Sequence, residues 1–547
     1  MSSVTESHDL VIIGAGAAGL AAAAGAYDAG VRDIVVLERE SGAGGILKQC
    51  IHNGFGLHRY REELTGPEYA LREMQAVAQR DIPVFFDTTV IDLTADRAVV
   101  TVSPERGVVS IAAGAVILAM GSRERTRGML GIAGTRPAGI YTAGAAQNLI
   151  NLHGIVPGKE IVMLGSGDIG LIVARRLAYE GSHIKMVLNR SHFSGGLKRN
   201  IVQCLDDYGI PLRLSHTITA VHGRERVTGV EVSEVDPKTK QPIAGTEELV
   251  SCDTLLLSVG LIPENELTRE AGIRIDAKSN GASVDETLET EMPGVFSAGN
   301  VLHIHDLVDF VSEEGERAGK AAAAYLAGEK SHTDSYVSVQ PGQGVSYVVP
   351  QRVHADADGL VTFRFRGRDI YRSAQIRFFA DGEEIKTIKR RIILPAEMET
   401  VKVDAGLFAR AKTLEISLSA EEVGATQQTG DDELTCIQCP MGCALKVTLD
   451  GEGKVVDVEG ATCPRGKTYA KAEIEAPERV LTSLVDVAAR ELPLSVRTDG
   501  SIPKGLIPQA LEELRGITID GAVRTGEVVC SDVCGTGVDV IATKDVL

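Results

Sequence analysis

The sequence contains no tryptophan, few other aromatic residues and no long apolar run. Phe, Trp and Tyr together make up 4% of the 547 residues, whereas hydrophobic residues of all types make up 44%. That apolar content is ordinary for a globular protein, which excludes disorder as the general state of the chain. No apolar run approaches the roughly 18 residues of a membrane-spanning helix, so we expect no transmembrane segment.

Positive charge is also scarce, because 75 acidic residues outnumber 56 basic ones and the formal net charge is −19. Such a chain repels the phosphates of nucleic acid and the anionic surface of a membrane, so neither is an expected partner. The first ten residues lack the basic, apolar and small-residue order of a signal peptide. We therefore expect a cytoplasmic protein.

A glycine-rich turn follows the first apolar stretch of the chain. Residues 9–13 are predicted to form a buried strand that runs into Gly14, Gly16 and Gly19, ahead of an alanine-rich helix. Gly14 permits a tight turn, Gly16 lets the backbone approach a pyrophosphate, and Gly19 lets the helix pack closely. A second strand ends at Glu38, whose carboxylate can accept hydrogen bonds from a ribose. These features together predict a dinucleotide-binding unit.

The same pattern recurs in the middle of the chain. A predicted strand over residues 160–164 runs into Gly165, Gly167 and Gly170, and a helix and a further strand follow. We therefore expect two bound dinucleotides and two Rossmann-like units.

The residues that end the second strand of each unit differ. Glu38 stands 24 residues after Gly14, and the same interval from Gly165 leads to Asn189. Asn189 carries no charge to repel a 2′-phosphate, and Arg190 can pair with one. The second site is therefore predicted to favour NADP(H) slightly over NAD(H). Arg190 is equally compatible with a solvated surface position, so the choice between NAD and NADP stays open.

Three further short apolar strands end in glycine; the chain is expected to cross between the nucleotide units at the first two, and the third is expected to precede a helix. They end at Gly121, at Gly260 and at Gly299, which is followed by Asn300. With these segments, residues 9 to about 328 resemble the two-dinucleotide flavoprotein reductases of the thioredoxin-reductase and glutathione-reductase superfamily. The resemblance implies FAD in the first unit and NAD(P)H in the second. In that family an aspartate at the position of Asn300 bonds the FAD ribitol, and an amide can still do so.

Paired cysteines are missing beside the expected flavin. Disulfide reductases of that superfamily need two cysteines in one loop, one to attack and one to resolve. This chain has only Cys50, after Gly44 and Gly45, and no C-x-x-C in the nicotinamide domain, so we do not expect disulfide reduction. Gly45 is assigned to the cofactor site. Cys50 is either a lone thiol near the flavin or a buried small hydrophobe, and the second interpretation is favoured.

The segment over residues 48–58 is unusually polar for one that runs past the isoalloxazine ring. With residues 65–69 and 303–309 it resembles a subgroup of FAD/NAD(P) oxidoreductases associated with anaerobic-type glycerol-3-phosphate dehydrogenases and related to opine and amine oxidase subunits. The resemblance implies a partner dehydrogenase flavoprotein. His52, His303 and His305 are candidate proton donors near the flavin, because histidine titrates in the working range. Hydrogen-bonded structural histidines are the equal alternative.

Six of the nine cysteines lie in the last quarter of the chain. In an intracellular protein, cysteines are read as metal-binding, catalytic or buried rather than as a disulfide framework. Three are packed into one eight-residue loop, and a fourth, followed by proline, comes after nineteen further residues. The four are Cys436, Cys439, Cys443 and Cys463.

Three thiolates in one loop with a remote fourth suit a [4Fe–4S] cluster, whereas structural zinc more often uses two separated C-x-x-C knuckles. We predict the cluster, with zinc as the alternative. The spacing resembles the N-terminal iron–sulfur segment of molybdopterin oxidoreductases, and residues 432–547 resemble a cysteine-motif domain that accompanies the same dehydrogenase system as a separate chain. Cys530 and Cys534 lack further partners and stay unassigned.

The predicted fold class is α/β, with two Rossmann-like nucleotide-binding domains, a small β-sandwich-like domain and a C-terminal α+β cysteine-cluster domain. The length demands several domains, because single cores stop growing at roughly 250 to 300 residues. The expected boundaries are 1–150 with 265–330 (FAD), 151–264 (NAD(P)), 331–420 (sandwich), 421–432 (linker) and 433–547 (cysteine domain).

The predicted function is electron transfer among a nicotinamide, FAD and the cluster, with hydride exchange at the flavin and single electrons through the cluster. The partner would be a dehydrogenase of the glycerol-3-phosphate dehydrogenase type. Two alternatives stay open: oxidation of an opine-like or amine substrate by the flavin domain itself, and a non-enzymatic scaffold carrying zinc. The sequence does not fix the oligomeric state, and a homo-oligomer is possible.

Overall fold

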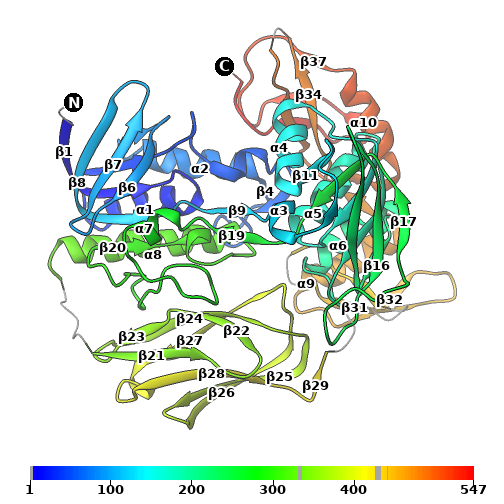
Figure 1. The fold of residues 1–547 in the computed structure, drawn as a ribbon. Coiled ribbons are helices and arrows are strands. Elements are labelled where there is room, and N and C mark those ends of the chain that lie inside the picture. The colour runs from blue at the N-terminus through cyan, green and yellow to red at the C-terminus, as the bar shows by residue number, and fades with distance from the viewer. Residues whose placement is uncertain (1–3, 330–334, 425–432, 440–441, 489, 547) are drawn as a thin grey trace.

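The computed structural model describes residues 4–329, 335–424, 433–439, 442–488 and 490–546 (Figure 1). The chain forms two α/β units, a two-sheet β-sandwich and a β-rich C-terminal unit. None of the helices among these residues combines the length and apolar character that crossing a bilayer requires.

The first α/β unit is built on a sheet with the order β5-β2-β1-β8-β7-β6, to which β20 is added beside β8. Because β20 comes from a distant part of the chain, the unit is discontinuous in sequence. The strands are β1 (Val4–Ile13), β2 (Ile34–Leu37), β5 (Val84–Phe85), β6 (Thr89–Leu93), β7 (Ala98–Ser103), β8 (Gly107–Leu118) and β20 (Val295–Ser297). A small hairpin of β3 (Asn53–Phe55) and β4 (Leu64–Thr65) precedes helix α2 (Gly66–Ala78).

Two helices of this unit pack so closely that the backbone of one lies against the backbone of the other. They are α1 (Ala17–Asp28) and α8 (Val308–Leu326). A Cβ added at Gly315 would lie 2.1 Å from the Ala18 carbonyl oxygen, and one at Gly319 would lie 2.2 Å from that of Ala22. Only glycine allows this approach, which places the middle of α8 beside the first turns of α1.

The second α/β unit contains the parallel sheet β11-β18-β12-β13-β14 and an antiparallel sheet β10-β15-β16-β17. Its parallel strands are β11 (Ile140–Thr142), β12 (Glu160–Leu164), β13 (His183–Asn189), β14 (Leu212–Leu214) and β18 (Thr254–Leu257). The others are β10 (Ala133–Gly134), β15 (His216–Gly223), β16 (Val227–Glu234) and β17 (Glu248–Ser251). Its helices are α3 (Arg127–Leu130), α4 (Ala143–His153), α5 (Asp168–Tyr179) and α6 (Lys198–Cys204).

The chain crosses between these units as a two-stranded antiparallel ribbon. The ribbon consists of β9 (Ser122–Glu124) and β19 (Leu261–Pro263), and the short helix α7 (Glu266–Glu270) follows it. Strand β9 begins directly after Gly121, and strand β19 begins directly after Gly260.

The β-sandwich packs two sheets around buried phenylalanines, Phe363, Phe365, Phe378 and Phe408. The first sheet has the order β23-β21-β28-β25-β26, with β29 beside β25, and the second has the order β22-β24-β27. The strands are β21 (Tyr336–Pro341), β22 (Val345–Val349), β23 (Arg352–His354), β24 (Leu360–Gly367), β25 (Tyr371–Ala380), β26 (Glu383–Ile393), β27 (Met398–Asp404), β28 (Thr413–Ser419) and β29 (Glu422–Val423). Thus β29 lies within the predicted linker, of which residues 425–432 lie outside the described residues.

The C-terminal unit has a three-stranded sheet that carries the cysteine loop and a five-stranded sheet packed on a helix. The first contains β30 (Glu433–Thr435), β31 (Ala444–Leu449) and β32 (Val455–Glu459), followed by α9 (Pro464–Glu475). The second has the order β37-β34-β35-β39-β38. Its elements are β34 (Thr482–Val487), β35 (Leu494–Thr498), α10 (Ile507–Arg515), β37 (Thr518–Ile519), β38 (Val528–Cys530) and β39 (Val540–Ala542), and β33 (Glu478–Arg479) pairs with β36 (Ile502–Pro503).

The C-terminal unit contacts both α/β units. Arg497 lies 3.0 Å from a carboxylate oxygen of Glu68 at the start of α2. In the second α/β unit, Asp207 receives Arg479 at 2.8 Å and Lys504 at 2.5 Å. In Figure 1 the C-terminal unit accordingly lies beside the second α/β unit, whereas the sandwich lies under the first.

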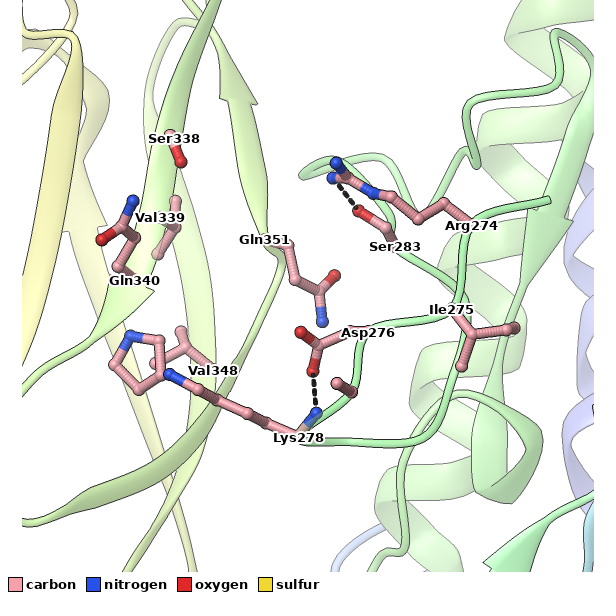
Figure 2. A pocket seen from close by; sticks show the side chains of 12 residues that line it. Arg274, Ile275, Asp276, Lys278, Ser283, Ser338, Val339, Gln340, Val348 and Gln351 are labelled. Atoms are coloured by element: carbon pink, nitrogen blue, oxygen red, sulfur yellow. Dashed lines mark hydrogen bonds between the residues drawn. The ribbon is translucent and has the colours of Figure 1, made fainter.

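A polar cavity of about 350 Å³ lies where the sandwich meets the first α/β unit (Figure 2). Arg274 and Asp276 approach it from the loop after α7, and Gln340 and Gln351 from the sandwich. None of its lining residues belongs to a glycine fingerprint or to the predicted catalytic set. This cavity is therefore a feature of the junction and not the nucleotide site.

Candidate functional site

The first glycine loop leaves open space beside the uncapped start of α1. A Cβ at Gly19 would lie 1.8 Å from the Gly14 carbonyl oxygen, so only glycine allows the helix to pack on the turn. Gly16 is the N-cap of α1, no side chain caps the helix there, and an added Cβ would meet nothing within 4 Å. Free amides at a helix start attract anions, and the open space admits one. The loop therefore fits a pyrophosphate.

Glu38 connects the end of β2 to this loop. The carboxylate is 6% exposed, and its two oxygens accept hydrogen bonds from the amides of Ala15, at 2.8 Å, and Glu40, at 2.9 Å. Each carboxylate oxygen has two lone pairs, so acceptor capacity remains for a ribose hydroxyl. Its position at the end of the second strand is the predicted one.

Three more predicted glycines take positive φ values, and two of them lie close to α1. The Cβ position of Gly45 (φ +53°) is 3.3 Å from the Gly16 Cα, and that of Gly299 (φ +77°) is 2.8 Å from the Ala18 Cβ. Gly121 (φ +73°) lies three residues after the end of β8, and its Cβ position has no atom within 4 Å. Glycine at positions 45 and 299 therefore lets these turns approach α1, whereas Gly121 leaves open space beside its backbone.

Asn300 holds the turn that follows β20. Its Oδ1 accepts a hydrogen bond from the His305 amide at 3.0 Å. This contact uses one acceptor of the side chain, and an amide nitrogen with two further hydrogens remains. The fold thus positions Asn300 through its own loop.

The second glycine loop repeats the geometry of the first. A Cβ at Gly165 would lie 1.9 Å from the Ser258 carbonyl oxygen, and one at Gly170 would lie 2.7 Å from the Ser258 Cβ. Gly167 is the N-cap of α5, again without a side-chain cap. The start of α5 therefore offers free amides to a second anionic group.

The residues at the end of β13 are engaged with nearby backbone. Asn189 donates its amide to the Phe193 carbonyl, and the exposed Arg190 donates Nε to the Lys240 carbonyl at 3.0 Å. Arg190 has no acidic partner among the described residues. Its guanidinium lies directly after the end of β13.

His52 and Cys50 lie on the segment that faces the second α/β unit. Burial, followed by the charges of Arg175 and Arg199, lowers the pKa of His52 to about 3, and its Nδ1 has no hydrogen-bond partner. The Cys50 thiol lies 3.8 Å from Gln147 Oε1, and burial raises its pKa to about 12. At neutral pH His52 is therefore uncharged and Cys50 is a thiol.

His303 and His305 meet at a buried carboxylate, Glu314 of α8. His303 Nε2 lies 3.0 Å from Glu314 Oε1, and His305 Nε2 lies 3.4 Å from Oε2. Oε2 also accepts a hydrogen bond from the Gly299 amide at 2.8 Å. Arg364 of β24 donates Nη1 to Oε1 at 2.5 Å. The sandwich thus reaches the cofactor loop through Arg364 and Glu314.

Glu314 and Arg364 form a buried ion pair within this cluster. Burial lowers the pKa of His303 to about 4, so the ring is neutral at pH 7. Burial acts to raise the pKa of Glu314, but its contacts with His305, His303 and Arg364 outweigh burial and hold that pKa well below its usual range. The ligand atoms of His303, His305 and Glu314 lie within 4.8 Å of one another, as metal ligands do, but the Arg364 charge already compensates the carboxylate.

The four predicted thiols gather at one end of the C-terminal unit, close enough for the charges of the other three to act on Cys436. The Cys436 amide donates to the Cys443 carbonyl at 2.9 Å, and Cys463 is the N-cap of α9. The amides of Gly466 and Arg465 lower the pKa of Cys463. Residues 440 and 441 within the loop lie outside the described residues.

This thiol loop packs against α6 of the second α/β unit. Gln203 donates Nε2 to the Ile437 carbonyl at 3.4 Å, and Val202 packs on the cluster of buried residues that includes Cys436 and Cys443. The cysteine loop is therefore docked on the nucleotide-binding part of the chain.

Residues 8–327, more than half of the chain, match the model of the pyridine nucleotide-disulphide oxidoreductase family. The chain belongs to this family. It is an FAD-dependent oxidoreductase that uses a pyridine nucleotide. Residues 464–544 match a second model, DUF1667, a family described only as a protein of unknown function.

Several known proteins are similar to this oxidoreductase. One opine oxidase subunit, from Agrobacterium tumefaciens (strain Ach5), is 26% identical over 320 residues, covering 55% of this chain and 62% of that protein. Thioredoxin reductase of Treponema pallidum (strain Nichols) is 27% identical over 322 residues, covering 58% and 97%. A solved thioredoxin reductase of Lactococcus lactis has a TM-score of 0.48 at 19% identity, covering 59% and 99%. The chain thus spans about three fifths of the length of the opine oxidase protein.

Two side chains of the site escaped prediction, Glu314 and Arg364. A signal existed for Glu314, because spacings of four residues place it on the same helix face as Ala318 and Ala322, which are buried. For Arg364 the alternation along β24 gives no signal, since its neighbours Phe363 and Phe365 are both fully buried as well.

Proposed function

We propose that the chain passes electrons between a nicotinamide dinucleotide, FAD and an iron–sulfur cluster, and exchanges them with a partner dehydrogenase flavoprotein of the glycerol-3-phosphate dehydrogenase type. The observation that carries the proposal is the docking of the four-thiol loop on α6, in a chain whose remaining part belongs to a flavoprotein family. The bound flavin would supply the exchange between hydride and single electrons, and the chain's residues bind and orient the reactants.

In this proposal the cofactor residues divide between the two glycine loops. FAD would lie on Gly14, Gly16, Gly19, Glu38, Gly45, Gly121, Gly299 and Asn300. The nicotinamide dinucleotide would lie on Gly165, Gly167, Gly170, Asn189 and Arg190. The uncapped helix starts at Gly16 and Gly167 support both assignments.

His52, Cys50, His303 and His305 are the candidate catalytic residues, and we propose different roles for them. Because the low pKa of His52 leaves its ring neutral, we assign it a hydrogen bond to a reactant, not a stored proton. His303 and His305 would act through Glu314, which also holds the Gly299 amide. Cys50 would serve as a small packing group, in keeping with its protonated thiol.

The spacing of the cysteines along the chain favours a cluster over a single zinc ion. Cys436, Cys439 and Cys443 lie in one eight-residue loop, and Cys463 stands apart at the start of α9. Three thiols in one loop with a remote fourth suit a cubane cluster, whereas structural zinc more often uses two separated C-x-x-C knuckles.

A second candidate function is oxidation of an opine-like or amine substrate by the flavin domain. The similarity to the opine oxidase protein favours it, although this chain covers 62% of that protein. Reduction of artificial dyes by NAD(P)H separates the two candidates: it is expected for the first, whereas flavin bleaching by amines without dye reduction supports the second.

The test of the cluster compares the purified protein with the Cys436→Ser variant. We expect a flavin absorbance spectrum, about four iron atoms per chain for one [4Fe–4S] cluster, and an electron paramagnetic resonance signal after reduction. Cys436→Ser should lose the iron and keep the flavin. Cys530→Ser is the matched control, since Cys530 belongs to the same unit but bonds Glu513 instead. Zinc without iron, or a protein without flavin, would refute the proposal.

A further inference from the structure

Two arginines of the second α/β unit face the segment that carries His52. Arg199 of α6 lies against the backbone of Gly54, where an added Cβ would be 2.6 Å from its Nη2. Arg175 of α5 lies near enough for its charge, like that of Arg199, to act on the His52 ring. The three side chains therefore share the space between the flavin segment and the second unit.

Within the described parts of the chain, neither guanidinium has a carboxylate within 4.0 Å, although Arg199 is only 6% exposed. Arg199 Nη1 and His52 Nδ1 are both buried without a hydrogen-bond partner. Buried cations are normally paired, because their desolvation costs several kcal/mol. Here the counter-charge does not come from the described residues.

The acidic side chains nearest to Arg199 and Arg175 are bound to other partners. Asp168, which the charge of Arg199 reaches, accepts hydrogen bonds from the Leu197 amide at 2.8 Å and from Asn200 Nδ2 at 2.7 Å. Asp207, which acts on Arg175, is held by Arg479 and Lys504 of the C-terminal unit. Both arginines therefore keep donors for another anion.

The phosphates of the two nucleotides are assigned to sites other than Arg175 and Arg199. In the proposed function, the pyrophosphates are assigned to the starts of α1 and α5, and a 2′-phosphate to Arg190, the residue that follows β13. Arg175 lies seven residues after the first residue of α5, Asp168, which is about 10 Å along the helix axis. A planar guanidinium presents paired donors that match a carboxylate or a phosphate.

We propose that Arg175, Arg199 and His52 bind the carboxylate or phosphate group of the substrate that reacts at the flavin. This inference rests on the proposed function, because it takes residues 50–55 to border the flavin. The substrate would then be a small anion. His52 would form a hydrogen bond to the same anionic group that the two arginines bind.

The test measures binding of inorganic phosphate and of acetate to the FAD-loaded protein by isothermal titration calorimetry. We expect one of the two anions to bind, and Arg199→Met to weaken that binding at least tenfold, with Arg199→Lys in between. Arg213→Met is the matched control, since Arg213 belongs to the same unit but is paired with Glu248 at 2.7 Å. Which anion binds distinguishes a carboxylate substrate from a phosphorylated one.

Thermal unfolding gives an independent readout. Because Arg199 is buried without a partner, Arg199→Met should leave the Tm unchanged or raise it. A lower Tm, or wild-type anion affinity in Arg199→Met, would overturn the inference. So would a loss confined to NADP⁺ affinity, which would assign the arginines to the nucleotide. Flavin content and dye reduction by NAD(P)H are measured on the same samples, so failure of the proposed function is seen separately.

Discussion

Replacing Arg364 by methionine is expected to destabilise the first α/β unit from within the sandwich. Arg364 is 2% exposed and Glu314 is 1% exposed, and they meet at 2.5 Å. Removing one partner of a buried ion pair typically costs about 3–5 kcal/mol, because the other charge is left uncompensated. Methionine keeps the length of the aliphatic stem, so little packing is lost.

The consequence should be visible in the cofactor as well as in the fold. Glu314 also holds the Gly299 amide, and its uncompensated charge favours protonation or displacement of that carboxylate. For a unit of this size the cost corresponds to a fall in Tm of roughly 6–20 °C. We expect flavin release, followed by its fluorescence during heating, to move by a similar amount.

Two comparisons make this prediction refutable. Arg377→Met is the control, because Arg377 and Glu384 form an exposed ion pair on the same sandwich. Exposed pairs contribute about 0–1 kcal/mol, so the control should unfold like the wild type. Arg364→Met with Glu314→Gln should recover part of the loss, since it removes both charges. A Tm within 2 °C of the wild type for Arg364→Met alone, roughly the effect of 1 kcal/mol or less, would refute the reasoning.

Three further predictions concern other parts of the chain. Gly19→Ala should abolish flavin binding, since the new methyl would lie 1.8 Å from the Gly14 carbonyl oxygen; the ratio of flavin to protein absorbance in the purified variant measures this, and normal loading would contradict it. Burial lowers the pKa of His303 from 6.5 to about 4, so on acidification through that window the unfolded chain binds a proton that the folded chain does not, and stability should fall by up to about 1.4 kcal/mol per pH unit. His303→Asn should flatten this slope in urea titrations between pH 7 and pH 4.5, and an equal slope would count against it. Arg497→Met should loosen the C-terminal unit from Glu68 and expose it to limited proteolysis, with an unchanged digestion pattern as the opposing result.

The nucleotide loops could be predicted from the sequence because their constraints are local. Gly14, Gly19 and Gly165 each sit where an added Cβ would collide with backbone within a few residues or at the neighbouring strand end, so residue type and spacing carry the information. Glu38 follows from the length of one strand–helix–strand unit.

Contacts between units were not predictable, because they depend on how separately folded parts meet. Arg364 and Glu314 are 50 residues apart in sequence, and nothing in either segment specifies the other. The docking of the C-terminal unit through Arg497 on Glu68 spans 429 residues. The orphaned Arg199 is visible only once the absence of an acid around it can be checked in three dimensions.

The C-terminal unit grips both α/β units at once, through Arg497 on Glu68 and through Arg479 and Lys504 on Asp207. These two sets of ion pairs hold the C-terminal unit in one position relative to the α/β units, and they oppose its movement as a separate domain. The thiol loop would then keep a constant distance from the flavin through every turnover, and electron transfer would depend on that distance and not on solvent viscosity or on the length of residues 425–432.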